Sequence, residues 1–220
     1  LESYQCQIKN HIKPSLGAIR LEALNTHTIQ AFYNTLSKPN GDKPGLSPKS
    51  VKIIHGVLHK ALNQAIAVGY LRFNPADACK LPRVVRKELK PMDDDAIGKF
   101  LKAIRCHKYE SLFLVTLFTG MRQGEVLGLM WNCIDFERGT ILINKQLQKV
   151  IGEKDVYNLM STKSGKGRSI TPACYVMDLL RAQKARQAEA QLLAGELWHQ
   201  SDLVFTNELG EHLRPHTVYH

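Results

Sequence analysis

The chain has 220 residues, of which 44% are hydrophobic, and its formal net charge at pH 7 is +10. This length suits one large domain or two modest ones, and the ordinary apolar content predicts a soluble globular protein. The longest apolar run, near residues 112–118, is too short to span a bilayer, and no signal-peptide pattern opens the sequence. We therefore expect no membrane segment and no secretion, but a cytoplasmic protein.

The basic residues are unevenly placed along the chain. Residues 1–91 hold 14 lysines and arginines against 5 aspartates and glutamates, whereas residues 92–220 hold 16 against 15. A basic first part indicates electrostatic binding of a polyanion, most commonly nucleic acid. The alternative is a domain that is basic and solvated but binds no polyanion. The five cysteines are scattered without a CxxC pair, so neither a disulfide framework nor a zinc site is expected.

The first part of the chain has the pattern of a helical domain. A helix-like pattern covers residues 1–12, and a turn is expected around Pro14. A second helix follows, capped by Asn25 or Thr26. Residues 37–46 are rich in proline and glycine, which predicts a loop.

A third helix is predicted from Ser47–Pro48, a cap followed by proline at the first helical position, to about Val68. Its apolar residues recur at helical spacing, and its opposite face is basic and could lie along phosphates. His55 and His59 are one turn apart and could share a metal, but with no third ligand nearby we favour exposure to solvent or DNA. The DNA-binding candidates on this face are Lys49, Lys52, His55 and Lys60.

Residues 80–90 resemble an extended basic linker, because prolines interrupt them and basic side chains dominate. Such a linker could follow a DNA backbone. Its DNA-binding candidates are Arg83, Arg86 and Lys87. We therefore expect a helical DNA-binding domain over residues 1–82, a linker over 83–91 and a second domain over 92–220.

The second domain is expected to mix helices with a few strands. Asp93–Asp95 should open a helix, since acidic groups suit its positive end. The further expected elements are helices over 109–118 and 122–130, strands over 140–148, 156–162 and 168–171, a long helix over 172–194 and a last helix from about Pro215. The predicted fold class is thus mainly α with a small antiparallel β-meander.

The stretch Thr119–Glu125 (TGMRQGE) is the most informative part of this domain. Arg122 and Glu125 would share one helical face between two apolar runs, where a charged pair is costly unless it is satisfied. The planar fork of an arginine matches phosphate oxygens, which favours a phosphate site. A structural pair that locks a helix start is the alternative.

A second basic group is predicted at a glycine-rich hairpin tip. Lys163 lies at the start of this tip, and Lys166 and Arg168 come after Lys163 in the chain. A lysine on such a tip could protonate a leaving oxygen. The alternative is a hairpin tip that is merely solvated and has no catalytic role. A phosphate-binding P-loop is excluded because the GxxxxGK[ST] pattern is absent.

Taken together, these motifs resemble the tyrosine recombinases, and in particular the integrases of phages and conjugative transposons. Residues 119–131 (TGMRQGEVLGLMW) resemble the first catalytic box of that family, with Asp135 at its downstream acidic position. Residues 162–168 (TKSGKGR) resemble its catalytic-lysine hairpin, and residues 12–17 (IKPSLG) resemble its core-binding domain.

The resemblance implies a site-specific DNA recombinase, the integrase of a mobile element. A tyrosine would attack a phosphodiester, leaving a 3′-phosphotyrosyl link and a free 5′-hydroxyl. Arg122 would bind the nonbridging oxygens, Glu125 would support the Arg122 helix, and Lys163 would be the general acid, with Lys166 as the alternative. No metal and no nucleotide cofactor are implied. DNA contacts are further expected from Lys166 and Arg168.

The resemblance also implies binding partners and a second catalytic box, which is not found in these residues. The partners would be a double-stranded DNA recombination site, other copies of the protein in dimers or tetramers on DNA, and an accessory excision or DNA-bending protein, all in the bacterial cytoplasm. The family's second box, HxxR followed by the tyrosine nucleophile, is not found, and Tyr219 precedes its expected place. We therefore assign no nucleophile and expect a fragment that is inactive alone; a nonenzymatic DNA-binding protein on the same scaffold is the alternative.

Overall fold

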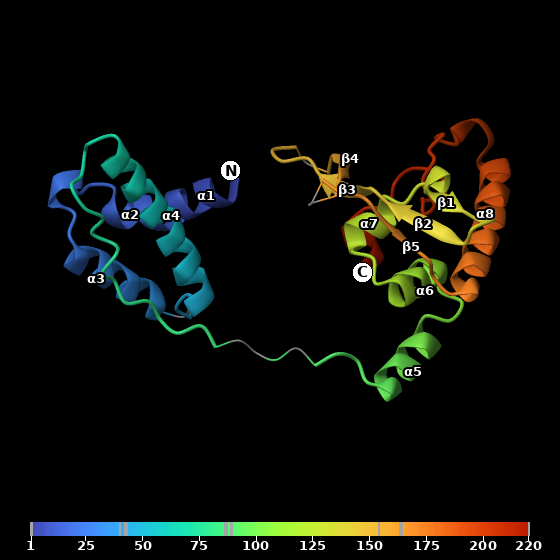
Figure 1. The fold of residues 1–220 in the computed structure, drawn as a ribbon, viewed down its shortest axis with the longest axis horizontal. Helices are drawn as coiled ribbons and strands as arrows, with labels where there is room; N and C mark the ends of the chain where they lie inside the picture. Colours follow the sequence, from blue (N-terminus) through green and yellow to red (C-terminus); the bar gives the residue numbers. More distant parts are fainter. Residues whose placement is uncertain are drawn as a thin grey trace. The chain divides into compact units, whose positions relative to one another are not determined.

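The computed structural model describes residues 2–39, 41, 44–85, 88, 90–153, 155–162 and 165–219. The chain forms two compact units, Leu1–Lys90 and Pro91–His220 (Figure 1). The N-terminal unit is helical, and the C-terminal unit combines helices with short antiparallel strands. The predicted fold class, mainly α with a small antiparallel sheet, is confirmed.

Helices make up most of the N-terminal unit. In chain order they are α1 (Glu2–Gln7), the π-helical η1 (Ile8–Ile12), α2 (Lys13–Leu16), the 3-10 helix η2 (Leu21–Ala23), α3 (Thr26–Ser37) and α4 (Pro48–Ala67). The first three follow without a break, so the chain stays helical through Pro14, where a turn was predicted. Pro14 is the second residue of α2, and proline is tolerated in the first turn of a helix.

The starts of α3 and α4 are set by side-chain caps. The Asn25 side chain accepts the backbone N–H of Thr28, and the Ser47 hydroxyl accepts the backbone N–H of Ser50. Each cap satisfies a donor that the first helical turn leaves without a partner. Both predicted helix starts are therefore confirmed.

The core of the N-terminal unit lies between the apolar faces of α3 and α4. Its buried residues are Leu16, Ile29, Phe32, Tyr33, Val51, Ile54, Leu58, Leu62 and Ala76. The members on α4 recur at helical spacing, as the sequence predicted, and this leaves the opposite face of α4 to solvent.

In the described residues, the C-terminal unit begins with three α-helices and ends with two, which are separated by a short 3-10 helix. Its elements are α5 (Asp94–Ala103), α6 (Glu110–Thr119), α7 (Gln123–Leu127), η3 (Trp131–Cys133), β1 (Ile134–Asp135), β2 (Thr140–Ile143), β3 (Lys145–Lys149), β4 (Tyr157–Ser161), β5 (Arg168–Ile170), α8 (Cys174–Ala194), η4 (Gly195–Leu197) and α9 (Pro215–Tyr219). The predicted start of α5 is confirmed, and the Asp93 side chain caps it by accepting the backbone N–H of Ala96. None of the helices in the described part of the chain is both long and apolar enough to cross a membrane.

The strands form two separate antiparallel sheets. One has the order β1-β2-β5, and the other is the hairpin β3-β4. The single strand predicted over residues 140–148 is therefore two strands, which separate at Asn144: β2 pairs with β5, and β3 pairs with β4. In a sequential meander each strand would pair with the next one in the chain. Here β5 follows the β3-β4 hairpin in the chain but pairs with β2.

The core of the C-terminal unit brings helices against the three-stranded sheet. Figure 1 shows α8 running alongside this sheet. The fully buried side chains include Val115 on α6, Leu127 on α7, Ile141 and Ile143 on β2, and Leu180 on α8. This packing fixes α7, which carries the motif singled out in the sequence, between α6 and the strands.

Candidate active site

A tight turn places Arg122 at the start of α7. Helix α6 ends at Thr119, and Gly120 then takes a left-handed conformation with φ +63°, which glycine adopts without steric cost. The Met121 side chain is buried in the core, and Arg122 is the N-cap residue of α7. The turn therefore holds the Arg122 backbone in place from both sides.

Glu125 is the buried partner of Arg122. Its side chain is only 1% exposed. One of its oxygens, Oε2, accepts the backbone N–H of Arg122 at 2.9 Å, and the other, Oε1, accepts Arg122 Nη1, also at 2.9 Å. Arg122 is thus bound to this carboxylate through both its main chain and its side chain.

Arg168 is the second cation on the same carboxylate, and it comes from β5. Its Nη1 donates to Oε1 of Glu125 at 2.9 Å and its Nη2 donates to Oε2 at 2.6 Å. This is the bidentate fork that guanidinium and carboxylate groups form when their planes match. The Glu125 carboxylate therefore ties α7 to a strand that lies 43 residues later in the chain.

The two arginines keep Glu125 ionised despite its burial. The hydrogen bonds from Arg168 are the largest cause of a lowered Glu125 pKa, burial opposes them, and the bonds from Arg122 add to them. The balance lowers the pKa of Glu125 to about 2. In turn, Glu125 raises the pKa of Arg168. Glu125 and Arg168 are therefore both charged at neutral pH.

Arg122 presents its guanidinium to solvent. Its side chain is 75% exposed, compared with 42% for Arg168. Within the described residues, Glu125 is the one acidic group paired with Arg122. The outward donors of this fork can bind an oxyanion such as a phosphodiester.

The turn between β4 and β5 is held by the buried Thr162. The Thr162 hydroxyl donates to the Lys166 carbonyl at 2.9 Å, and the backbone N–H of Gly165 donates to the Thr162 carbonyl at 2.8 Å. Lys166 is exposed on this turn. Lys163, the predicted general acid, lies outside the described residues.

The predicted DNA-binding residues of the N-terminal unit are distributed over α4 and the segment after it. Lys49, Lys52 and Lys60 are exposed on α4, and Arg83 is exposed in a segment without regular structure. Arg86 and Lys87 lie outside the described residues. The exposed lysines share the face of α4 that its apolar side leaves open.

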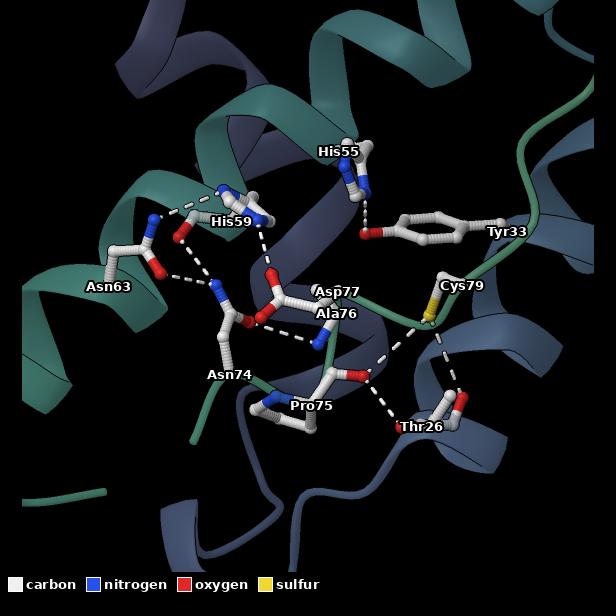
Figure 2. Close-up of polar contacts among 10 residues, drawn as sticks. All are labelled: Thr26, Tyr33, His55, His59, Asn63, Asn74, Pro75, Ala76, Asp77 and Cys79. Carbon is white, nitrogen blue, oxygen red and sulfur yellow. Dashed lines mark hydrogen bonds and ion pairs between the residues drawn. The ribbon is translucent and has the colours of Figure 1, made fainter. Parts of the chain in front are cut away.

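His55, the remaining candidate on α4, is half-buried and has a partner inside the protein. Its Nδ1 lies 3.0 Å from the Tyr33 hydroxyl (Figure 2). Burial lowers the pKa of His55. The neighbouring His59 and Lys52 lower it further, whereas Asp77 raises it. The imidazole therefore favours its neutral form, and a DNA contact by His55 stays a prediction.

A network of side-chain amides fixes the proton of the neighbouring His59 (Figure 2). Asn74 Oδ1 accepts the N–H of Ala76 at 2.9 Å, so its Nδ2 faces Asn63 Oδ1 at 2.7 Å. The Asn63 amide nitrogen then faces His59 Nδ1 at 3.3 Å, which makes Nδ1 an acceptor. Neutral His59 therefore carries its proton on Nε2, 2.7 Å from Asp77 Oδ1.

Sequence reasoning assigned Arg168 to DNA and did not find its bond to Glu125. One signal was available: a glutamate between two apolar runs needs a cationic partner once it is buried. The sequence offered the adjacent Arg122 for that purpose, and nothing local indicated a second arginine. A DNA contact by Arg168 stays a prediction beside the structural role seen here.

A helical unit followed by a mixed unit, with an arginine and a glutamate at the start of a short helix, is the arrangement of the tyrosine recombinases. The chain belongs to the phage integrase family, whose profile matches residues 90–220. The profile of the phage integrase N-terminal SAM-like domain matches residues 1–37. The resemblance noted from the sequence motifs is confirmed.

Individual relatives agree with this family. The chain is 30% identical to a tyrosine recombinase XerC-like protein of Caldanaerobacter subterraneus subsp. tengcongensis, over 94% of the chain and 56% of that protein. It is 28% identical to an integrase of Saccharopolyspora erythraea, over 68% of the chain and 33% of that protein. The chain thus spans about half or less of the length of these curated relatives.

Two solved structures show the same fold. One is the Tn1549 transposon integrase in complex with transposon right end DNA, with a TM-score of 0.77 and 18% identity, over 95% of this chain and 65% of that one. The other is a lambda integrase dimer bound to a COC′ core site, with a TM-score of 0.66 and 20% identity, over 99% of this chain and 54% of that one. At this identity the likeness is one of fold.

Proposed function

We propose that this chain is part of a site-specific DNA recombinase, the integrase of a mobile element. The observation that carries the proposal is Arg122: its guanidinium is exposed, yet it is anchored to a buried carboxylate at the start of α7. Family membership supports the proposal, as do relatives that are named integrase and tyrosine recombinase.

In the proposed reaction, a tyrosine hydroxyl attacks the scissile phosphorus and the bond from phosphorus to the 5′-oxygen breaks. Arg122 binds the nonbridging oxygens and stabilises the negative charge that develops on them. Lys163 donates a proton to the departing 5′-oxygen, and Lys166 is the alternative donor. Glu125 holds Arg122 in place. We assign the nucleophile to no residue of these 220, and the 3′-phosphotyrosyl link preserves the bond energy for rejoining.

We further propose that residues 1–82 bind duplex DNA and that residues 83–91 link them to the catalytic part, which begins at residue 92. The exposed lysines of α4 and the excess of basic residues in this part of the chain support a phosphate contact. The related lambda integrase has been solved as a dimer on a core site and as a tetramer on a Holliday junction. We propose a similar assembly on DNA for this protein, with an accessory excision or DNA-bending protein, in the bacterial cytoplasm.

The test uses the full-length protein that contains these residues and duplex DNA from the ends of its element, nicked so that the covalent complex accumulates. Arg122→Ala should lower the rate of covalent complex formation by at least about 100-fold, because one charge-stabilising donor is lost. DNA affinity should change little. Arg138→Ala removes an arginine of similar exposure that pairs with Asp135, and it is the matched control.

Wild-type cleavage by Arg122→Ala would overturn the phosphate role of this residue. A protein that binds the element ends tightly but never forms a covalent complex would instead support the nonenzymatic alternative. The two outcomes are separated by measuring affinity and covalent complex formation on the same DNA.

A further inference from the structure

The carboxylate of Glu125 is shared unequally between two cations. Arg168 donates to both oxygens, at 2.9 and 2.6 Å, whereas the Arg122 side chain donates to one of them, at 2.9 Å. Two guanidinium groups and one carboxylate give the cluster a net charge of +1. Because the bidentate partner is Arg168, the charge of Glu125 is balanced mainly from β5.

We propose that Arg168 is a positioning residue that neutralises Glu125 and thereby leaves the positive charge of Arg122 available to the scissile phosphate. The inference rests on the proposed function, since it presumes a phosphate at Arg122. Without Arg168, Arg122 and Glu125 would form a neutral pair, and an incoming phosphate would approach a buried carboxylate at close range. Because the Glu125 carboxylate is buried, its repulsion of a negative charge is screened less than repulsion between two exposed groups.

The geometry favours this role over a direct phosphate contact by Arg168. Both terminal nitrogens of its guanidinium are bonded to Glu125. Its backbone is fixed as well, since Arg168 is paired with Ile143 in the ladder between β5 and β2. To bind DNA through its fork, Arg168 would have to release a carboxylate that is 1% exposed and leave it with fewer partners.

A double-mutant cycle with Glu125 separates the two roles in the full-length protein. Arg168→Met leaves a neutral Arg122–Glu125 pair and should slow covalent complex formation by about 100-fold. Glu125→Gln combined with Arg168→Met removes the carboxylate together with its partner and restores the net charge of +1. This double variant should cleave within roughly tenfold of the wild-type rate, a strong departure from additivity.

Two outcomes of the cycle would overturn the inference. If the rate losses of the Arg168→Met and Glu125→Gln single variants simply add in the double variant, Arg168 does not act through Glu125. A double variant with weakened DNA affinity and a salt slope reduced by about one unit would show a direct phosphate contact. If Arg168→Met alone does not fold, the double variant still decides the question, because it lacks Arg168 altogether.

A neutral substrate supplies a readout that a merely structural role would not change. In a methylphosphonate at the scissile position, a methyl group replaces one nonbridging oxygen, so the ground-state charge is absent. The rate loss caused by Arg168→Met should shrink by at least about tenfold on this substrate, because the ground state and the transition state each carry one negative charge fewer and are repelled less by Glu125. An equal loss on both substrates would contradict the proposal.

Failure of this inference is distinct from failure of the proposed function. If Arg122→Ala abolishes cleavage but the cycle is additive, the recombinase assignment stands and Arg168 is not its positioning residue. If Arg122→Ala cleaves normally, the assignment of the phosphate site itself fails.

Discussion

Gly128 and Leu147 meet backbone to backbone. A Cβ atom built on Gly128 would lie 2.6 Å from the amide nitrogen of Leu147, a distance that real Cβ contacts do not reach. Gly128 is the residue that ends α7, and Leu147 lies in the middle of β3. The absence of a side chain at Gly128 therefore sets how closely the Arg122 helix packs on the hairpin.

Gly128→Ala should destabilise the protein by roughly 1–3 kcal/mol, because the added methyl group pushes α7 away from a backbone that cannot yield. Urea denaturation measures the change in free energy of unfolding. Gly98→Ala is the matched control: Gly98 lies within α5 and its Cβ would meet nothing within 4 Å, so alanine should be neutral or stabilising there. Equal effects at the two sites would contradict the packing argument.

Acid should weaken the protein through Glu125. The folded-state pKa of Glu125 is lowered from 4.5 to about 2, so the unfolded chain binds its proton first as the pH falls. The stabilisation is complete above about pH 4.5, is lost progressively towards pH 2 and amounts to roughly 3 kcal/mol.

Urea unfolding between pH 3 and pH 7 tests this pH dependence. The free energy of unfolding of the wild type should fall more steeply with acid than that of Glu125→Gln, which has no proton to bind at this position. Glu196→Gln, at an exposed position, should keep the wild-type slope. Parallel curves for Glu125→Gln and the wild type would refute a strongly lowered pKa.

Thr162→Val should slow DNA cleavage by about tenfold while DNA affinity is retained, because it removes the bond from Thr162 to Lys166 beside the proposed general acids. Single-turnover cleavage by the full-length protein measures the effect. A 5′-thiol leaving group needs less protonation, so it should reduce the loss if the effect passes through Lys163. Thr140→Val, on β2, is the control; an equal slowing by both variants would point to a general loss of stability.

Lys52→Ala and Lys60→Ala should each weaken duplex DNA binding and reduce the slope of log affinity against log salt by about 0.9, the value for one phosphate contact. Fluorescence anisotropy over a salt series measures the slope. Lys184→Ala removes the same charge from α8, where Lys184 lies over the Trp131 ring, and should leave the slope unchanged. If all three variants shift the slope alike, the effect reflects net charge and not a face of α4.

The sequence predicted best what local chemistry decides. The starts of α3, α4 and α5 depend on Asn25, Ser47 and Asp93, each of which caps a donor only three residues away. The separation of β2 from β3 at Asn144 was missed because residues 140–148 contain no glycine or proline that would mark a break. Which strand pairs with which is decided by contacts with distant residues, and the local pattern carries no information on them.

The candidate site likewise contains one contact that is local in sequence and one that depends on distant residues. Arg122 and Glu125 are close in sequence, so their pairing could be predicted from helical spacing. Arg168 lies 43 residues from Glu125 and sits among glycines and lysines, a composition typical of a solvated or DNA-binding turn. Only the pairing of β5 with β2 brings its guanidinium to the buried carboxylate.

The double attachment of Arg122 to Glu125 also has an entropic consequence. A free arginine side chain gives up about 2 kcal/mol of rotamer entropy when it is immobilised. Here the main-chain N–H and one terminal nitrogen are already held on one carboxylate, at 2.9 Å each. Under the proposed function, much of that ordering is complete before any DNA arrives, so a larger share of the attraction to a phosphate remains for binding and for the transition state.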